Sequence, residues 1–175
     1  AWNLDPLVEG KGQEGVNQLL EQAEALTGEL EQWRGRIGEL EVPELVSAMS
    51  TLAEIQDRLG RAGSWVSLRF SVDTSDPARG AAMQKFQEQA TELSTRLIFL
   101  ELEWAEVPEQ RASVLLESED LAFCRYYLES ARRYRPHLLT EPEEKILAEK
   151  DVTSSSAWSR LFDDLSSAIV IELPE

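Results

Sequence analysis

The chain has 175 residues, of which 42% are hydrophobic, and its 33 acidic side chains outnumber 17 basic ones to give a formal net charge of −16. This length and composition are typical of one globular domain and argue against wholesale disorder. An electrostatic field of that sign repels phosphate backbones and anionic lipids. Nucleic acid and membrane surfaces are therefore excluded as partners.

The compartment is indicated by what the sequence lacks. Cys124 is the single cysteine, so no intramolecular disulfide can form, which suits a reducing environment. No apolar run approaches the roughly 20 residues that span a bilayer, and no basic stretch followed by an apolar one opens the chain as a secretion signal would. We expect a cytoplasmic protein.

A long amphipathic helix is predicted over residues 16–40. Apolar side chains recur there every three or four positions, which places them on one stripe of a helix. The stripe consists of Val16, Leu19, Ala23, Leu26, Leu30, Trp33, Ile37 and Leu40.

Two further long helices follow. One begins near Pro43, a residue suited to the first helical position, and its stripe runs to Phe70. The other begins after Asp76, the predicted N-cap, with Pro77 in its first turn, and continues to Trp104. The connections at 41–43 and 73–77 are short, so neighbouring helices must run antiparallel. The sequence predicts an all-α, antiparallel helical bundle.

Shorter elements are predicted beyond this bundle: helices at 108–117, 119–134, 141–150 and 155–168, then a β-strand at 169–173. Thr140 and Glu143 have the spacing of a capping box for the third of these helices. The strand lacks a partner within the chain, and intact proteins avoid an unpaired apolar edge. We therefore expect the chain to be part of a longer one, and a dimer through 169–173 to be possible for the fragment.

These elements divide the chain into an opening segment (1–14), three long helices (15–105), shorter helices (106–168) and the orphan strand (169–175). Neither a catalytic nor a metal or cofactor site is predicted within them. His137 is the only imidazole, and Pro136 and the Thr140 cap keep it off the helix of Glu141, so a structural role at a link is expected. Cys124 lies in an apolar helical pattern and is predicted to be a buried thiol.

Arginines gather at one place in this acidic chain: Arg125, Arg132, Arg133 and Arg135. The last three lie at the end of a predicted helix, where positive charge favours the helix dipole. The alternative interpretation is functional, with Arg132, Arg133 and Arg135 contacting the carboxylate of a peptide substrate.

Three stretches resemble the oligoendopeptidase F branch of the thimet-oligopeptidase-like zinc metallopeptidases, in the family's order. The first is Trp2-Asn3-Leu4-Asp5-Pro6-Leu7, and the second runs from Trp65 through Asp73-Thr74-Ser75-Asp76-Pro77. The third, 135–165, includes Arg135-Pro136-His137-Leu138-Leu139 and Ser156-Ala157-Trp158; we interpret Trp158 as a packing residue. Pro142 departs mildly from the family, which more often has an acidic residue there.

The resemblance implies an all-helical N-terminal lobe that narrows a substrate channel, with a catalytic domain as its C-terminal partner in the same polypeptide and oligopeptides as substrates. It implies zinc in the full-length parent, bound by a His-Glu-x-x-His helix that has no counterpart here. The chain alone should then be inactive. Two other interpretations stay open: a stand-alone helical interaction module, and a hydrolase that uses carboxylates alone.

Overall fold

The computed structural model describes residues 2–169, which form helices joined by short links and contain no strand. The α-helices are α1 (Gln13–Leu30), α2 (Val42–Val72), α3 (Pro77–Glu106), α4 (Glu109–Leu116), α5 (Arg125–Arg133), α6 (Glu141–Thr153) and α7 (Ser155–Ser167). Short 3-10 segments are η1 (Asp5–Val8), η2 (Glu31–Trp33), η3 (Ile37–Glu39), η4 (Glu119–Leu121) and η5 (Arg135–His137). The predicted all-α class is confirmed.

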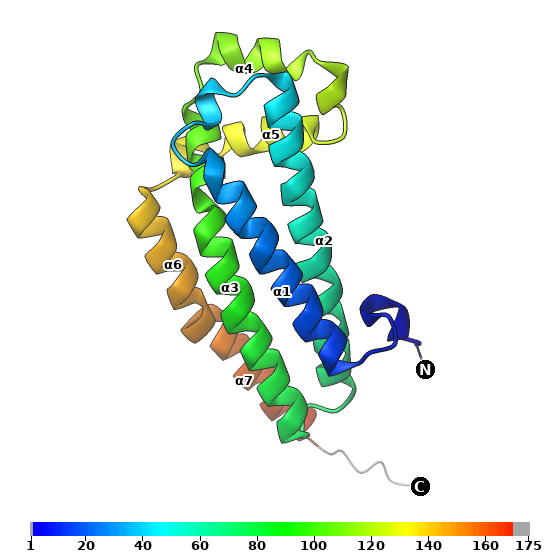
Figure 1. Ribbon diagram of the computed structural model, residues 1–175. Helices are drawn as coiled ribbons and strands as arrows, with labels where there is room; N and C mark the ends of the chain where they lie inside the picture. Colours follow the sequence, from blue (N-terminus) through cyan, green and yellow to red (C-terminus); the bar gives the residue numbers. More distant parts are fainter. Residues whose placement is uncertain (1, 170–175) are drawn as a thin grey trace, which may run out of the picture.

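The long helices lie side by side, with α4 and α5 across one end (Figure 1). The core lies mainly between α1 and α2 and along the second half of α3, where the apolar stripes of these helices face inward. Among its fully buried side chains are Ala23, Leu30, Ile55, Ala62 and Trp104. Thr27 is buried with them, and its hydroxyl donates to the Ala23 carbonyl at 2.8 Å, which satisfies its polar group within the helix.

The first helix is shorter than the pattern predicted, because α1 ends at Leu30 rather than at Leu40. Gly35 has φ +78°, a left-handed conformation that ends a helical path. The Glu103 carboxylate of α3 accepts from the Gly35 and Ile37 backbone N–H groups at 2.7 and 3.1 Å. Ile37 and Leu40 are nevertheless buried, because two 3-10 turns deliver them to the same core that a straight helix would have reached.

Helix starts follow the predicted capping chemistry. Asp76 caps α3 by accepting from the Ala78 N–H at 2.8 Å. A capping box at the start of α6 pairs Thr140 with Glu143, whose carboxylate accepts from the Thr140 N–H at 3.0 Å. The second helix begins at Val42 beside Pro43. These predictions are confirmed because they depend on residues within one turn of each other.

The single helix predicted at 119–134 is wrong: the structure has η4, a turn at Cys124 and then α5. Cys124 has φ −120° and ψ 0°, outside the helical range. Segment η4 contacts α2, whereas α5 contacts α3. The chain bends at Cys124 because Leu121 and Leu128, both fully buried, pack against different long helices.

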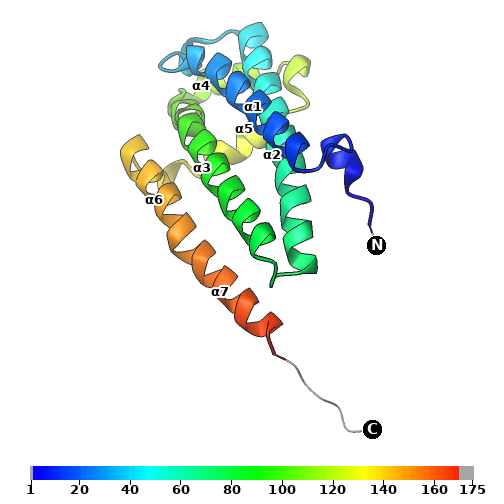
Figure 2. The ribbon, with the colours of Figure 1, turned by 60° about the horizontal axis from the view of Figure 1, so that its bottom comes forward.

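Helices α6 and α7 run in succession along the side of α3 that faces away from α1 and α2 (Figures 1 and 2). Arg34 ties the start of α6 to the bundle: it pairs with Glu141 and donates to the Arg96 carbonyl at 2.8 Å. None of the helices described between residues 2 and 169 combines the length and apolarity needed to cross a bilayer. Of the predicted strand at 169–173, Ile169 is not extended into a strand, and the other positions lie outside the described residues.

Candidate functional site

Of the three arginines predicted to contact substrate, Arg132 is committed to the fold. Its side chain is only 10% exposed. One guanidinium nitrogen donates to the Trp104 carbonyl at 3.0 Å and another pairs with Glu109 at 2.7 Å. The guanidinium also lies 5.6 Å from the centre of the Trp104 ring, within cation–π range. Arg132 therefore joins α3, α4 and α5, and its geometry does not support a substrate contact.

Arg133 and Arg135 point outward instead, and both are exposed. Successive residues of a helix are about 100° apart. The Arg133 side chain is therefore exposed to solvent, whereas the Arg132 side chain packs against the bundle. Tyr126 and Tyr134 are exposed on the same segment. Cations beside aromatic rings can contact both the carboxylate and the side chains of a peptide. This exposed segment of α5 and η5 is the part of the arginine cluster that is free for a ligand.

The neighbouring polar groups are structural. The Trp104 indole N–H donates to the Leu128 carbonyl at 2.8 Å, and the Tyr127 hydroxyl donates to Glu101 at 2.8 Å. Burial, followed by the nearby Glu101 charge, raises the pKa of Tyr127, so the phenol stays protonated and donates. These bonds hold α5 across the end of α3.

His137 and Cys124 offer no catalytic chemistry. The His137 backbone N–H donates to the Tyr134 carbonyl at 2.8 Å within η5, so this residue forms part of a link, as expected. Cys124 is buried, as predicted, and burial raises the pKa of its thiol, which suppresses the nucleophilic thiolate. Across the described part of the chain, no three His, Cys, Asp or Glu side chains are placed to share a metal ion.

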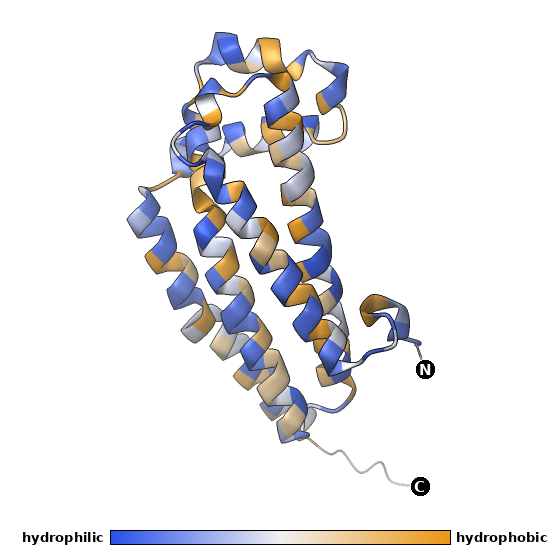
Figure 3. Ribbon diagram, in the orientation of Figure 1, coloured by the Kyte–Doolittle hydropathy of each residue, from blue (hydrophilic) through white to orange (hydrophobic). Residues whose placement is uncertain are grey.

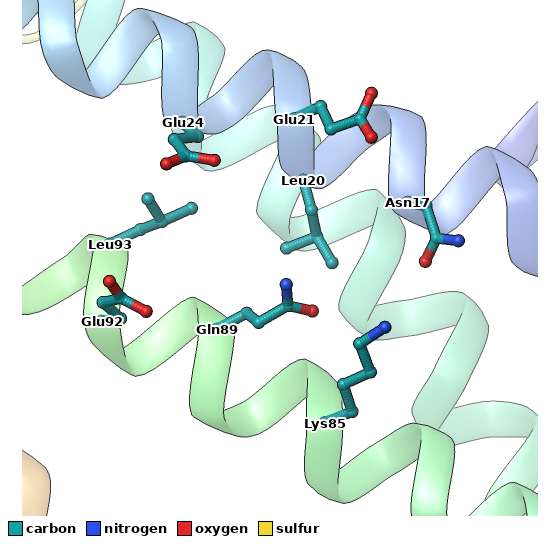
Figure 4. A pocket seen from close by; sticks show the side chains of 8 residues that line it. All are labelled: Asn17, Leu20, Glu21, Glu24, Lys85, Gln89, Glu92 and Leu93. Atoms are coloured by element: carbon teal, nitrogen blue, oxygen red, sulfur yellow. The ribbon is translucent and has the colours of Figure 1, made fainter.

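A polar groove that the sequence did not predict lies between α1 and α3, with a volume of about 240 Å³. In Figure 4, side chains from the two helices face each other across it. The lining comprises Asn17, Leu20, Glu21, Glu24, Lys85, Gln89, Glu92 and Leu93. Three carboxylates, one amine and two amides supply hydrogen-bonding groups along this groove. No periodic pattern within one helix reveals such a groove, because it depends on how α1 and α3 are aligned.

The outer face of α7 is the second unpredicted feature. Trp158, interpreted from the sequence as a packing residue, is 70% exposed, so that interpretation is wrong. The sequence predicted a helix at 155–168, but the spacing of apolar residues in a helix does not tell which face meets the bundle. Here the large apolar side chains face away from it.

Comparison with known proteins shows that this helical chain is similar to the N-terminal part of a class of peptidases. A family model described as Oligopeptidase F, for the N-terminal part of a peptidase, matches residues 103–170, from the end of α3 through α7. This confirms the resemblance to the N-terminal lobe of oligoendopeptidase F.

One relative is oligopeptidase PepF of Bacillus subtilis (strain 168), to which the chain is 24% identical over 168 residues. The alignment covers 95% of this chain but 24% of the relative, so the chain spans about a quarter of the length of the protein it matches. No solved structure matches the chain significantly.

Proposed function

We propose that the chain is the N-terminal, non-catalytic helical lobe of an oligopeptide-cleaving zinc metalloendopeptidase, and that it shapes and restricts the substrate channel. The observation that carries the proposal is an alignment over nearly the whole chain to a quarter of an oligopeptidase. The family match at 103–170 agrees with it. In this proposal the partner of the lobe is the catalytic part of the same polypeptide.

The described residues of this chain do not fit a zinc site, because they offer no group of three metal-binding side chains. We therefore assign the zinc to the catalytic part and derive no step of the reaction from this chain. What the lobe contributes is shape. At 1.5 Å per residue, α2 and α3 are each about 45 Å long, so the packed pair can form a stiff wall beside a channel. A channel kept narrow by such a wall is wide enough for unfolded oligopeptides but too narrow for folded proteins.

A substrate contact fits the exposed part of the arginine cluster. Arg133 and Arg135 are exposed on α5 and η5, in a chain whose net charge of −16 repels a peptide carboxylate elsewhere. We extend the proposal to these two residues and leave out Arg132, whose donors are engaged. The oligopeptide is the substrate of the whole enzyme, and the expected compartment remains the cytoplasm.

The coding sequence downstream of residue 175 tests the proposal. We expect it to encode a His-Glu-x-x-His motif on a helix within the same reading frame. A reading frame that stops at residue 175, or one that continues without a zinc-binding motif, would contradict the proposed function.

A stand-alone interaction module is the second candidate, favoured by the exposed apolar face of α7. It predicts self-association or capture of a separate helical partner rather than attachment to a catalytic part. Sedimentation of the purified chain lacking residues 169–175 separates the two, because the deletion removes the predicted strand as a dimer contact. A monomer across a hundredfold concentration range supports the peptidase lobe, and a reversible dimer supports the module.

A further inference from the structure

Helices α6 and α7 are packed with their apolar side outward. The positions that are partly covered recur every four residues, as expected of the side of a helix that meets a neighbour. They are Glu144, Ala148, Val152, Ser156, Arg160 and Asp164, which are mostly small or polar. Not one residue of α6 or α7 is buried. Figure 3 shows hydrophobic residues along both helices, although neither has contributed to the core.

Four exposed apolar residues of α7 form a defined surface, which we call the α7 outer face: Trp158, Leu161, Phe162 and Leu165. Relative to Trp158 they lie three, four and seven positions on, a spacing that places all of them within about 100° of the helix circumference. Their exposed fractions are between 44% and 70%. An apolar stripe this regular on the surface of a highly charged protein marks an interface.

The attachment of α7 to the lobe is polar and sparse. The Arg160 guanidinium donates to the Gln84 side chain of α3 at 2.9 Å. Asp151 accepts from the Ser155 and Ser156 hydroxyls, which fixes the junction between α6 and α7. Such contacts set the direction of α7 but bury little apolar surface. The apolar surface of α7 that is available for a larger contact lies on the opposite side, at the α7 outer face.

Charge excludes two possible occupants of the α7 outer face. Residues 141–169 contain seven acidic and three basic side chains, a net charge of −4, and the whole chain carries −16. A second copy would bring an equal negative charge to the interface, and an anionic lipid surface would do the same. The occupant must be apolar at its centre and neutral or basic at its rim.

The extent of the homologous region indicates which occupant meets these conditions. The family match runs through α6 and α7 to residue 170, so this outward-facing segment belongs to the part of the chain that matches the family. In the relative, about three quarters of the length lies outside the aligned region. That remainder is large enough to cover a helix face, and covalent attachment raises its effective concentration over any separate partner.

We propose that the α7 outer face is the surface on which this lobe packs against the catalytic part of its parent peptidase, whose facing surface is apolar with a basic rim. The proposal rests on the proposed function. It makes α7 the element that connects the helical lobe to the catalytic part.

Thiol labelling at Phe162→Cys tests this, with Val114→Cys on α4 as the matched control. Phe162 is 70% exposed and Val114 is 68% exposed, and α4 lies at the opposite end of the molecule from α7 (Figure 1). The native Cys124 is buried with a raised thiol pKa, so it reacts slowly in both variants. Leu165→Cys provides a second position on the face. Circular dichroism confirms that each variant is folded.

All three variants are labelled with a maleimide in the 175-residue chain and in the full-length parent protein. We expect Phe162→Cys and Leu165→Cys to react at least about tenfold more slowly in the full-length protein, and Val114→Cys to react equally in both. Equal rates at all three positions in both proteins would overturn the docking proposal. Protection within the 175-residue chain that grows with its concentration would identify a second copy as the occupant and would also overturn it.

Failure of this proposal is distinct from failure of the proposed function. If a zinc motif lies downstream but Phe162→Cys is not protected in the full-length protein, the proposed function is supported and the docking proposal is contradicted. A reading frame that ends at residue 175 removes the proposed function itself, and the docking proposal falls with it.

Discussion

The α1–α3 bundle and the α6–α7 pair use the same amphipathic pattern in opposite ways. In the bundle the apolar stripes face inward, and side chains such as Ile55 and Ala62 are completely buried. In α6 and α7 the partly covered side is polar and the large apolar residues are exposed. The bundle therefore supplies the stability of the lobe, whereas α7 supplies a surface for association. A helix can be well formed and amphipathic without contributing to the core of its own domain.

Two tryptophans distinguish the core of the bundle from the α7 outer face. Trp104 is 1% exposed and Trp158 is 70% exposed. Trp104→Ala should lower the free energy of unfolding by about 3–5 kcal/mol, because it leaves a large cavity. Trp158→Ala should change it by no more than about 0.5 kcal/mol. Urea unfolding followed by circular dichroism measures both, and equal losses would contradict the assignment of α7 to an association surface.

The arginine cluster gives a second contrast. Arg132→Ala should cost about 1–3 kcal/mol of unfolding free energy, because it leaves the Trp104 carbonyl without its donor. Arg133→Ala, which alters an exposed side chain, should change stability by less than about 0.5 kcal/mol. In the full-length enzyme, Arg133→Ala combined with Arg135→Ala should raise KM for peptides with a free terminal carboxylate and leave KM for amidated peptides unchanged. An equal effect on both peptide types would remove these arginines from substrate recognition.

Two glycines test the unexpected end of α1. Gly35 has φ +78°, so Gly35→Ala should destabilise the lobe by about 1 kcal/mol. Gly28 lies within α1, where an added methyl meets its nearest atom, an Arg96 guanidinium nitrogen, at 4.0 Å. Gly28→Ala should therefore stabilise by about 0.5–1 kcal/mol through helix propensity. Thermal melts of both variants show whether each substitution raises or lowers the stability. A stabilising Gly35→Ala would mean that the helix does continue beyond Leu30.

The ion pair between Glu31 and Arg96 should make a small contribution to the pH dependence of stability. The hydrogen bond from Arg96 lowers the pKa of Glu31 from its ordinary value of 4.5. Because the folded-state pKa lies below the unfolded one, this contribution is fully present above pH 4.5 and is lost as the pH falls through the lowered value. The pair is about one-third exposed, so solvent limits the effect to about 1 kcal/mol or less.

Glu31→Gln should remove that part of the acid sensitivity. The loss of unfolding free energy between pH 7 and pH 3 should be smaller in this variant than in the native chain, at constant ionic strength. Glu29→Gln, which removes one carboxylate at an exposed neighbouring position, is the matched control for the change in net charge. Identical pH profiles for the native chain and Glu31→Gln would show that the Arg96 pair carries no pH-dependent stability.

Local signals in the sequence predicted the fold where neighbouring residues determine it. Asp76 before Pro77 and Thr140 before Glu143 fixed helix starts, because a cap is completed within one turn. The end of α1 could not be predicted, because the carboxylate that holds the turn at Gly35 belongs to Glu103, far along the chain. The break at Cys124 likewise depends on two different long helices.

For the candidate site, the sequence predicted that arginines gather in one segment, but not which of them are exposed. Sequence proximity grouped Arg132 with Arg133 and Arg135, and the helical rotation between neighbours then separated the buried residue from the exposed ones. The stripe on α7 was present in the spacing of Trp158, Leu161 and Leu165. The spacing did not reveal that this stripe faces outward, because packing decides which side of a helix meets a neighbour.

The proposed function requires that this lobe cleave no peptide without the catalytic part of its parent. Cleavage of an internally quenched fluorogenic oligopeptide by the purified 175-residue chain, with zinc supplied, tests it most directly. We predict no cleavage above the protein-free rate, whereas the full-length parent cleaves the same peptide and loses that activity to a chelator. Turnover that copurifies with the 175-residue chain would contradict the account.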